Sequence, residues 1–357
     1  MTRKVLRSGY TTGACAAAAS LGAALMLRDG DLLESVELVL PTGDKVRFDL
    51  CGQELLKQGA CCYVVKDAGD DPDVTHGIEL HARLCWTERK GTELDLIAGT
   101  GIGHVTKPGL AVAVGEPAIN PVPRKMITEA IHSVFPDIAA DKALCLTFSI
   151  PDGKQRAEKT LNERLGIVGG LSLLGTTGIV RPLSHKAWTD TLEVELDVAL
   201  AAKVPEMVLT TGRTSERAAQ QQPLPEEAFI MMGDYIGYCL DACHRKGVAN
   251  VTLAAQFAKL VKIACGHAQT HVRNSSLDLG QLAVWAKEIG LDAGDCERLE
   301  LAHTAREVYQ MFGAESPLVD RIAAQALTEM HARVPGSTVK ILLVDYQGKI
   351  AKVFLLI

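Results

Sequence analysis

The stretch EMVLTTGRTSERAAQQQPLPEEAFIMMGDYIGYCLDACHRKGVANVTLAAQ, residues 206–256, decides the class of the second half of the chain. It holds three short apolar runs, EMVLTTG, AFIMMGD and NVTLAAQ, and the residues between them predict helices over 215–222 and 235–246. Strands that alternate with helices favour a parallel sheet, because each parallel connection needs a long crossover. We therefore expect an α/β domain in this half.

The residues that flank this stretch extend the same pattern. Residues 188–202 alternate like a strand but have the length and alanine content of a helix, and we interpret them as a helix. The chain ends with VKILLVDYQGKIAKVFLLI, which predicts a β-hairpin. Further helices are predicted over 277–289, 296–312 and 318–333.

The first half has more strands and fewer helices. A Pro/Gly turn between two short apolar runs predicts a hairpin over 35–50. Thr12 is a candidate cap for a helix over 14–28, which Asp29-Gly30 would end. Basic residues precede this alanine-rich helix, as in a signal peptide, but GYTTG separates them from the apolar stretch. We therefore expect a helix of the folded protein.

These elements predict a β-rich α+β domain over 1–184 combined with a smaller parallel-sheet α/β domain over 185–335. The sequence leaves open whether the C-terminal hairpin, 336–357, joins the first domain.

Composition excludes several classes of protein. The 357 residues carry 37 Lys+Arg and 43 Asp+Glu, a net charge of −6, and only 4% aromatics, which argues against a nucleic-acid partner. The ten cysteines are scattered without a CxxC pair, which favours reduced thiols and a cytoplasmic location. No run of 18 strongly apolar residues appears, so no membrane partner is expected.

Three segments are dense in Gly, Thr and Ser: GYTTGACAAAAS (9–20), AGTGIGHVTKPGL (98–110) and GIVGGLSLLGTTGIV (166–180). Glycine lets a backbone turn sharply and approach a ligand closely. The middle segment is similar to a dinucleotide-binding loop, but two prolines follow where that motif needs a helix. Two interpretations stay open for these glycines, a ligand loop or the turns of a β-rich domain.

A second candidate site lies in the α/β half. Thr211 and Gly212 follow one predicted strand, and Asp234 follows the next. Ligands of parallel sheets bind beyond the carboxyl ends of strands, where an acid can bind ribose hydroxyls. The alternative is that Asp234 only caps the helix that starts at Tyr235.

His267 and His271 are four residues apart, as zinc ligands on a helix often are, but no third ligand is evident. We interpret them as polar surface or substrate-binding groups and expect no protein-held metal. Cys239, Cys243 and His244 match no zinc spacing, which favours burial of the two thiols.

Taken together, four ordered segments resemble one family, the cobalt-precorrin-5B C1-methyltransferases, or CbiD family. They are LRSGYTTGACAAAAS (6–20), GTGIGHVTKPGLAVAVGEPAINPVPRKMI (99–127), KTLNERLGIVGGLSLLGTTGIVRPLS (159–184) and GHAQTHVRNSSLD (266–278).

The resemblance implies an enzyme that methylates C1 of cobalt-precorrin-5B with S-adenosylmethionine, giving cobalt-precorrin-6A in anaerobic cobalamin biosynthesis. Cobalt would arrive only as part of the substrate. The main alternative is a non-catalytic corrinoid-binding carrier, and a homo-oligomer is an open alternative to a single chain.

The acetate and propionate groups of such a substrate call for basic side chains. The candidates for substrate binding are Lys107, Arg124, Lys125, Arg181, His267, His271 and Arg273. The candidates for cofactor binding are Thr11, Thr12, Gly101, Gly103, Thr211, Gly212 and Asp234. No catalytic side chain is assigned, because methyl transfer from a sulfonium needs no protein nucleophile.

Overall fold

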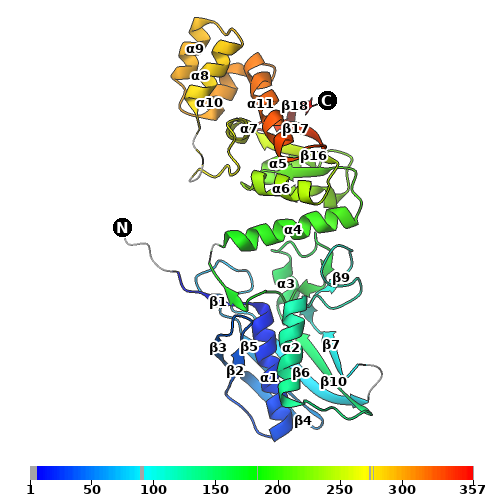
Figure 1. The fold of residues 1–357 in the computed structure, drawn as a ribbon. Coiled ribbons are helices and arrows are strands. Elements are labelled where there is room, and N and C mark those ends of the chain that lie inside the picture. The colour runs from blue at the N-terminus through cyan, green and yellow to red at the C-terminus, as the bar shows by residue number, and fades with distance from the viewer. Residues whose placement is uncertain (1–5, 89–91, 183, 273–274, 276, 357) are drawn as a thin grey trace. The chain divides into compact units, whose positions relative to one another are not determined.

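The computed structural model describes residues 6–88, 92–182, 184–272, 275 and 277–356. The chain divides into two compact units, Met1–His185 and Lys186–Ile357 (Figure 1). The two units combine an α+β fold with an α/β fold, and this confirms the predicted fold class.

The first unit is built on a five-stranded sheet. Neighbouring strands are antiparallel except for one pair, β10 (Lys142–Ser149) and β7 (Leu94–Ala98), which run parallel. In spatial order the strands are β4 (Cys51–Leu56), β5 (Gly59–Val65), β6 (Glu79–Glu88), β10 (Lys142–Ser149) and β7 (Leu94–Ala98).

Helix α1 (Thr12–Asp29) packs on β5 and β6, and α2 (Pro121–Val134) packs on α1 (Figure 1). Small side chains permit this close packing, because the run 14–19 is fully buried. The predicted helix is confirmed, but its predicted cap is wrong. The Thr11 side chain accepts from the Ala14 N–H, and Thr12 already lies inside the helix.

Short strands join the three glycine-rich segments to one another. Strand β1 (Gly9–Tyr10) pairs with β13 (Ile179–Val180), so the first segment meets the third. The middle segment meets the third through β8 (Gly101–Ile102) with β12 (Gly170–Leu171) and β9 (His104–Val105) with β11 (Ile167–Val168). The predicted hairpin, β2 (Ser35–Val39) and β3 (Lys45–Asp49), is confirmed.

The second unit has the predicted parallel sheet, with one antiparallel strand at its edge. The order is β15 (Phe229–Met231), β14 (Met207–Thr210), β16 (Asn250–Gln256), β17 (Thr338–Val344) and β18 (Ile350–Leu356), of which β18 is antiparallel. Since β17 pairs with β16, the C-terminal hairpin belongs to the second unit, and the alternative that it joins the first domain is wrong.

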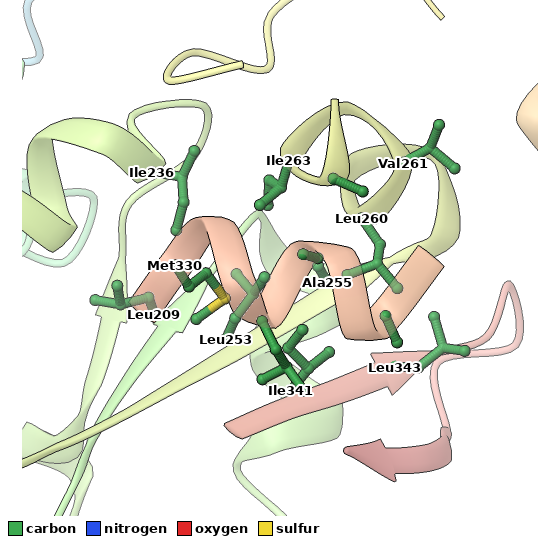
Figure 2. Packing of buried hydrophobic residues seen from close by; sticks show 14 of the residues in the cluster. Leu209, Ile236, Leu253, Ala255, Leu260, Val261, Ile263, Met330, Ile341 and Leu343 are labelled. Carbon is green, nitrogen blue, oxygen red and sulfur yellow. The ribbon is translucent and has the colours of Figure 1, made fainter. Parts of the chain in front are cut away.

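Helices cover both faces of this sheet. The short helix α5 (Arg213–Ala219) packs on one face through Ala218 and Ala219. On the other face, Met330 of α11 (Pro317–Arg333) lies among Leu209, Leu253 and Ile341 from three strands (Figure 2). That larger core also takes side chains from α4 (His185–Ala201), α6 (Ile236–Arg245) and α7 (Phe257–Ala264).

Three further helices complete the second unit, α8 (Leu279–Glu288), α9 (Ala293–Glu300) and α10 (Ala305–Phe312). The single helix predicted over 296–312 is therefore wrong. Thr304 starts a new helix there, because its side chain and Glu307 form a reciprocal capping box.

All ten cysteines are free thiols, and Cys239 and Cys243 are fully buried, as expected. Burial raises the pKa of Cys243 to about 12. Among the described residues, no helix combines the length and the apolar character that crossing a membrane needs.

Candidate functional site

A cavity of about 280 Å³ in the first unit brings two of the glycine-rich segments together. It lies where α1 begins, beside the loop that follows β5. The lining residues are Thr11, Thr12, Lys66, Asp73, Val74, Thr75, Lys159, Thr160, Asn162, Leu171, Ser172, Leu174 and Val180. Two predicted cofactor residues, Thr11 and Thr12, therefore line one cavity.

The first turn of α1 is fixed to the third glycine-rich segment. The Thr12 hydroxyl accepts from the Leu174 N–H at 2.9 Å and donates to the Ser172 carbonyl at 3.2 Å. Gly175 has a φ of +123°, and a Cβ there would lie 2.5 Å from the Thr11 side chain. A glycine is thus required at 175 for the two segments to meet.

Lys66 and Asp73 form an ion pair in the cavity wall, in which Lys66 is buried and Asp73 is partly buried. Lys66 Nζ lies 2.6 Å from Asp73 Oδ2, and the lysine is only 1% exposed. Asp73 Oδ1 accepts from the Thr75 N–H at 2.7 Å and from its hydroxyl at 2.6 Å. Burial alone would raise the pKa of Asp73, but the bonds from Lys66 and Thr75 outweigh it and the pKa is lowered.

The loop that carries Asp73 is anchored from both sides. Arg156 Nη1 donates to the Val74 carbonyl at 2.6 Å and to the His76 carbonyl at 2.9 Å. At the other end Arg7 pairs with Asp67, and the bonds from Arg7 and the Gly69 N–H lower the pKa of Asp67 to about 2. The loop is therefore held in a fixed position beside the cavity.

Two other predicted cofactor residues, Gly101 and Gly103, lie outside the cavity lining. A Cβ on Gly101 would lie 2.0 Å from the Ile150 carbonyl oxygen, and one on Gly170 would lie 2.1 Å from that of Gly101. A Cβ on Gly103 would meet Ile167 at 2.4 Å. These contacts favour the second interpretation of the middle segment, in which glycines permit close backbone packing.

The predicted residues of the second unit lie at the carboxyl edge of its sheet. Thr211 and Gly212 follow β14, and Asp234 follows β15. The Thr211 hydroxyl lies 3.1 Å from the Ser215 hydroxyl, and Gly212 immediately precedes α5. The structure thus brings these three residues to one sheet edge, as the parallel pairing of β14 and β15 requires.

Asp234 is tied to the segment 266–278. Its Oδ1 pairs with Lys259 Nζ and accepts from the Thr270 hydroxyl at 2.7 Å. Burial would raise the pKa of Asp234, but these two bonds outweigh it and lower the pKa. The alternative that Asp234 only caps the next helix is wrong, because the cap residue is Tyr235 and no side chain caps that helix.

His267 and His271 lie in an irregular segment after α7, so they do not share a helix face. The same segment is held by Lys262, whose Nζ donates to the Thr270 carbonyl at 2.9 Å. Burial and the nearby Lys259 lower the pKa of Lys262. Within the described residues, no three His, Cys, Asp or Glu side chains gather as metal ligands would.

The predicted lysines and arginines that the structure describes do not line the cavity. Lys107 Nζ donates to the Arg164 carbonyl at 3.1 Å. Arg124 pairs with Glu116 at 3.5 Å and Lys125 with Glu129 at 3.7 Å, both at the surface. The other two predicted basic residues are Arg181, which is exposed and follows the lining residue Val180, and Arg273, which lies outside the described residues.

Lys66 is not among the predicted site residues, although the sequence contains a signal for it. Alternate residues of β5, Ala60, Cys62 and Val64, point inward, and Lys66 follows in the same alternation. A lysine at an inward position needs an acidic partner, and the loop DDPD supplies Asp73. Lys159 at the cavity carried no comparable signal.

The family model for CbiD matches residues 1–182, and the model for the CbiD C-terminal domain matches residues 269–352. The chain belongs to the CbiD family. The first match encloses every residue of the cavity, and the second begins at Gln269, next to the Thr270 that binds Asp234.

Relatives of this CbiD-family chain match it nearly end to end. A cobalt-precorrin-5B C(1)-methyltransferase of Geobacter metallireducens is 52% identical over 98% of this chain and 99% of its own length. The protein of that name from Pseudomonas syringae is 41% identical, over 96% of this chain and 93% of the relative. The comparison with solved structures finds a crystal structure of the cobalamin biosynthesis protein CbiD from Archaeoglobus fulgidus. The two sequences are 29% identical, the match covers 71% of this chain and 78% of the archaeal chain, and the TM-score is 0.40.

Proposed function

We propose that this CbiD-family chain transfers the methyl group of S-adenosylmethionine to C1 of cobalt-precorrin-5B, giving cobalt-precorrin-6A for anaerobic cobalamin biosynthesis. The observation that carries the proposal is the 52% identity, over 98% of the chain, to a relative named for this C1 methylation. Cobalt enters with the substrate.

For this reaction the protein has to position the two reactants, and no side chain has to attack the methyl group. Bound S-adenosylmethionine would supply an electrophilic methyl group, and correct alignment of reactants contributes up to about 7–11 kcal/mol. Thr11 and Thr12 suit ligand binding because the fixed first turn of α1 holds them at the cavity. At about 280 Å³, the cavity lies below the roughly 300–1,000 Å³ of common small-molecule sites, so it fits part of a ligand.

Two positions for the cofactor remain in the proposal, the Thr11–Thr12 turn and the sheet edge at Thr211, Gly212 and Asp234. Asp234 Oδ1 is used by Lys259 and Thr270, while Oδ2 accepts no bond from the described residues. Oδ2 is therefore the atom that would bind a ribose hydroxyl. The proposed substrate contacts are Lys107, Arg124, Lys125, Arg181, His267, His271 and Arg273.

Label transfer tests the reaction. The protein is mixed with cobalt-precorrin-5B and S-adenosylmethionine that carries ¹³C in its methyl group, and NMR then detects label at C1. The corrinoid-carrier alternative predicts corrinoid binding without label transfer. Folded protein that binds the corrinoid and transfers no label would reject the proposed activity.

Paired substitutions separate the two cofactor positions. Thr11→Val should weaken S-adenosylmethionine binding in calorimetry if the cofactor lies in the cavity, and Asp234→Asn should weaken it if the cofactor lies at the sheet edge. Asp241→Asn is the control, because Asp241 pairs with Arg333 at the surface. Unchanged affinity in both variants removes both positions.

We also place the enzyme in the cytoplasm. Ten free thiols without a disulfide suit a reducing compartment. Labelling of intact and disrupted cells with a thiol reagent that does not cross membranes tests this, and labelling in intact cells would contradict it.

A further inference from the structure

We propose that the cavity of the first unit is a carboxylate-binding site, in which Lys66 Nζ and Ser172 Oγ donate to one carboxylate of a ligand and Lys159 attracts it. The proposal deepens the function above and rests on it, because both reactants of that methyl transfer carry carboxylates. It assigns a ligand chemistry to Lys66, Lys159 and Ser172.

The Lys66 ammonium has N–H donors without an acceptor among the described residues. An ammonium group has three N–H donors. Asp73 Oδ2 takes one of them, and the described residues supply no second acceptor for Lys66. The side chain lines the cavity although the residue is only 1% exposed. A buried charge with unused donors is costly, and an anion in the cavity would satisfy them.

Ser172 offers a second donor. The residue is 6% exposed and lines the cavity, and its hydroxyl makes no hydrogen bond with the described residues. Its carbonyl, by contrast, accepts from the Thr12 hydroxyl and fixes the backbone. Thr11 Oγ1 accepts from the Ala14 N–H, which leaves its own O–H as a third donor.

The electrostatics favour one negative charge. With Lys66, Lys159 and Asp73 as its charged residues, the lining has a net charge of +1. The 18-residue helix α1 begins at the cavity with no acidic residue in its first turn, so its N-terminal partial positive charge is not neutralised there. A dianionic phosphate would meet the nearby Asp73 carboxylate, whereas a monoanionic carboxylate matches the charge of the lining.

The apolar part of the lining and the cavity volume narrow the ligand further. Leu171, Leu174 and Val180 would contact carbon atoms next to the carboxylate. A volume of about 280 Å³ takes an amino-acid-sized arm and not a whole corrinoid. Two sources present such an arm, the methionine part of S-adenosylmethionine and an acetate or propionate arm of the corrinoid.

Two ligand pairs separate these sources. Calorimetry compares S-adenosylmethionine with decarboxylated S-adenosylmethionine, and absorption titration compares cobyrinic acid with its methyl ester. Each is measured on the full chain and on Ser172→Ala and Lys159→Gln. Lys154→Gln is the matched control, because Lys154 is exposed, lies outside the lining and loses the same charge. Circular dichroism melting confirms that each variant folds.

We expect Ser172→Ala to weaken binding of one carboxylate ligand about tenfold, since it loses a hydrogen bond to a charged group. Lys159→Gln should weaken it about threefold, with less effect at high salt, as exposed charges do. The carboxylate-free counterpart should bind the wild type weakly and the variants no worse. The ligand that responds identifies the source.

Two results overturn the proposal. If the wild type binds the carboxylate ligands and Ser172→Ala and Lys159→Gln bind them equally well, the carboxylate site fails while the methyltransferase proposal stands. If the wild type binds neither S-adenosylmethionine nor the corrinoid, the proposed function fails and the carboxylate site fails with it.

Discussion

At the residue scale, the Lys66–Asp73 pair dominates the energetics of the cavity wall. Removing one partner of a buried ion pair costs about 3–5 kcal/mol. The lower end applies to the loss of Lys66, because the Asp73 carboxylate left behind is partly exposed and keeps its two bonds from Thr75. Lys66→Met should therefore lower the free energy of unfolding by about 3 kcal/mol. Adding Asp73→Asn to it should recover part of the loss.

Urea unfolding measures both variants. Lys45→Met is the control, because Lys45 is exposed and its pair with Glu37 is 3.5 Å long. Its effect should stay within about 0.5 kcal/mol. If the double variant is less stable than Lys66→Met, the loss in Lys66→Met does not come from the Asp73 charge that is left without its lysine.

The same pair predicts a pH dependence. The folded pKa of Asp73 is below the ordinary value, so its carboxylate contributes its full stabilisation above the unfolded pKa of about 3.9. That contribution is lost as the pH falls through the lowered folded pKa. Stability measured from pH 6 to pH 2 should fall less steeply in Asp73→Asn than in the wild type. Parallel curves for the two proteins would contradict this.

Gly101 tests the packing interpretation of the middle glycine-rich segment. Gly101→Ala should cost about 3 kcal/mol or more, because its Cβ would lie 2.0 Å from the Ile150 carbonyl oxygen. Gly30→Ala is the matched control. Gly30 has a φ of +76° and Gly101 one of +73°, but a Cβ added at Gly30 would meet no atom within 4 Å. It should cost only the strain of about 1–2 kcal/mol. Equal losses in urea unfolding would mean that backbone strain alone explains Gly101.

At the scale of elements, the capping box at Thr304 starts α10 as a helix separate from α9. Thr304→Ala should cost about 1 kcal/mol in thermal unfolding, because an N-cap side chain is lost. Thr328→Ala is the control, since the Thr328 hydroxyl donates to the Ala324 carbonyl inside α11. Alanine is favoured in a helix interior, so this variant should be neutral or slightly stabilised. A Thr304→Ala protein of wild-type stability would show that the cap is dispensable.

The strands and long helices could be predicted because their patterns are local. The alternation of apolar runs with helices gave β14, β15 and β16, and the alanine-rich stretch gave α1. The two-residue strands at Gly101 and Gly170 could not, because they have no periodicity and exist only through long-range backbone pairing.

The candidate site could be predicted only in part, for a related reason. Thr11 and Thr12 lie in a segment whose composition marked it as a candidate, whereas Ser172 and Lys159 line the same cavity from far along the sequence. Asp234 was found at the correct sheet edge, but its partner Lys259 lies on the helix after the next strand. Such partners depend on tertiary packing, which one sequence does not encode as a local pattern.

At the scale of the whole molecule, each main core draws its side chains from one unit. Leu146 lies in the core of the first unit and Leu253 in that of the second, and both are fully buried. Replacing either by alanine should cost about 2–5 kcal/mol. Hydrogen exchange followed by mass spectrometry should accelerate mainly in the unit that carries the substitution. Equal acceleration in both units would show that they unfold as one.

The position of β17 in the second sheet has a consequence for protein synthesis. Strands β14, β15 and β16 leave the ribosome well before β17, yet β17 pairs along the whole of β16. Until residue 344 is made, one side of β16 therefore presents unpaired backbone groups to the cell. A chain truncated before β17 would keep an unpaired strand edge, which is prone to aggregation. The first unit, by contrast, is already complete at His185.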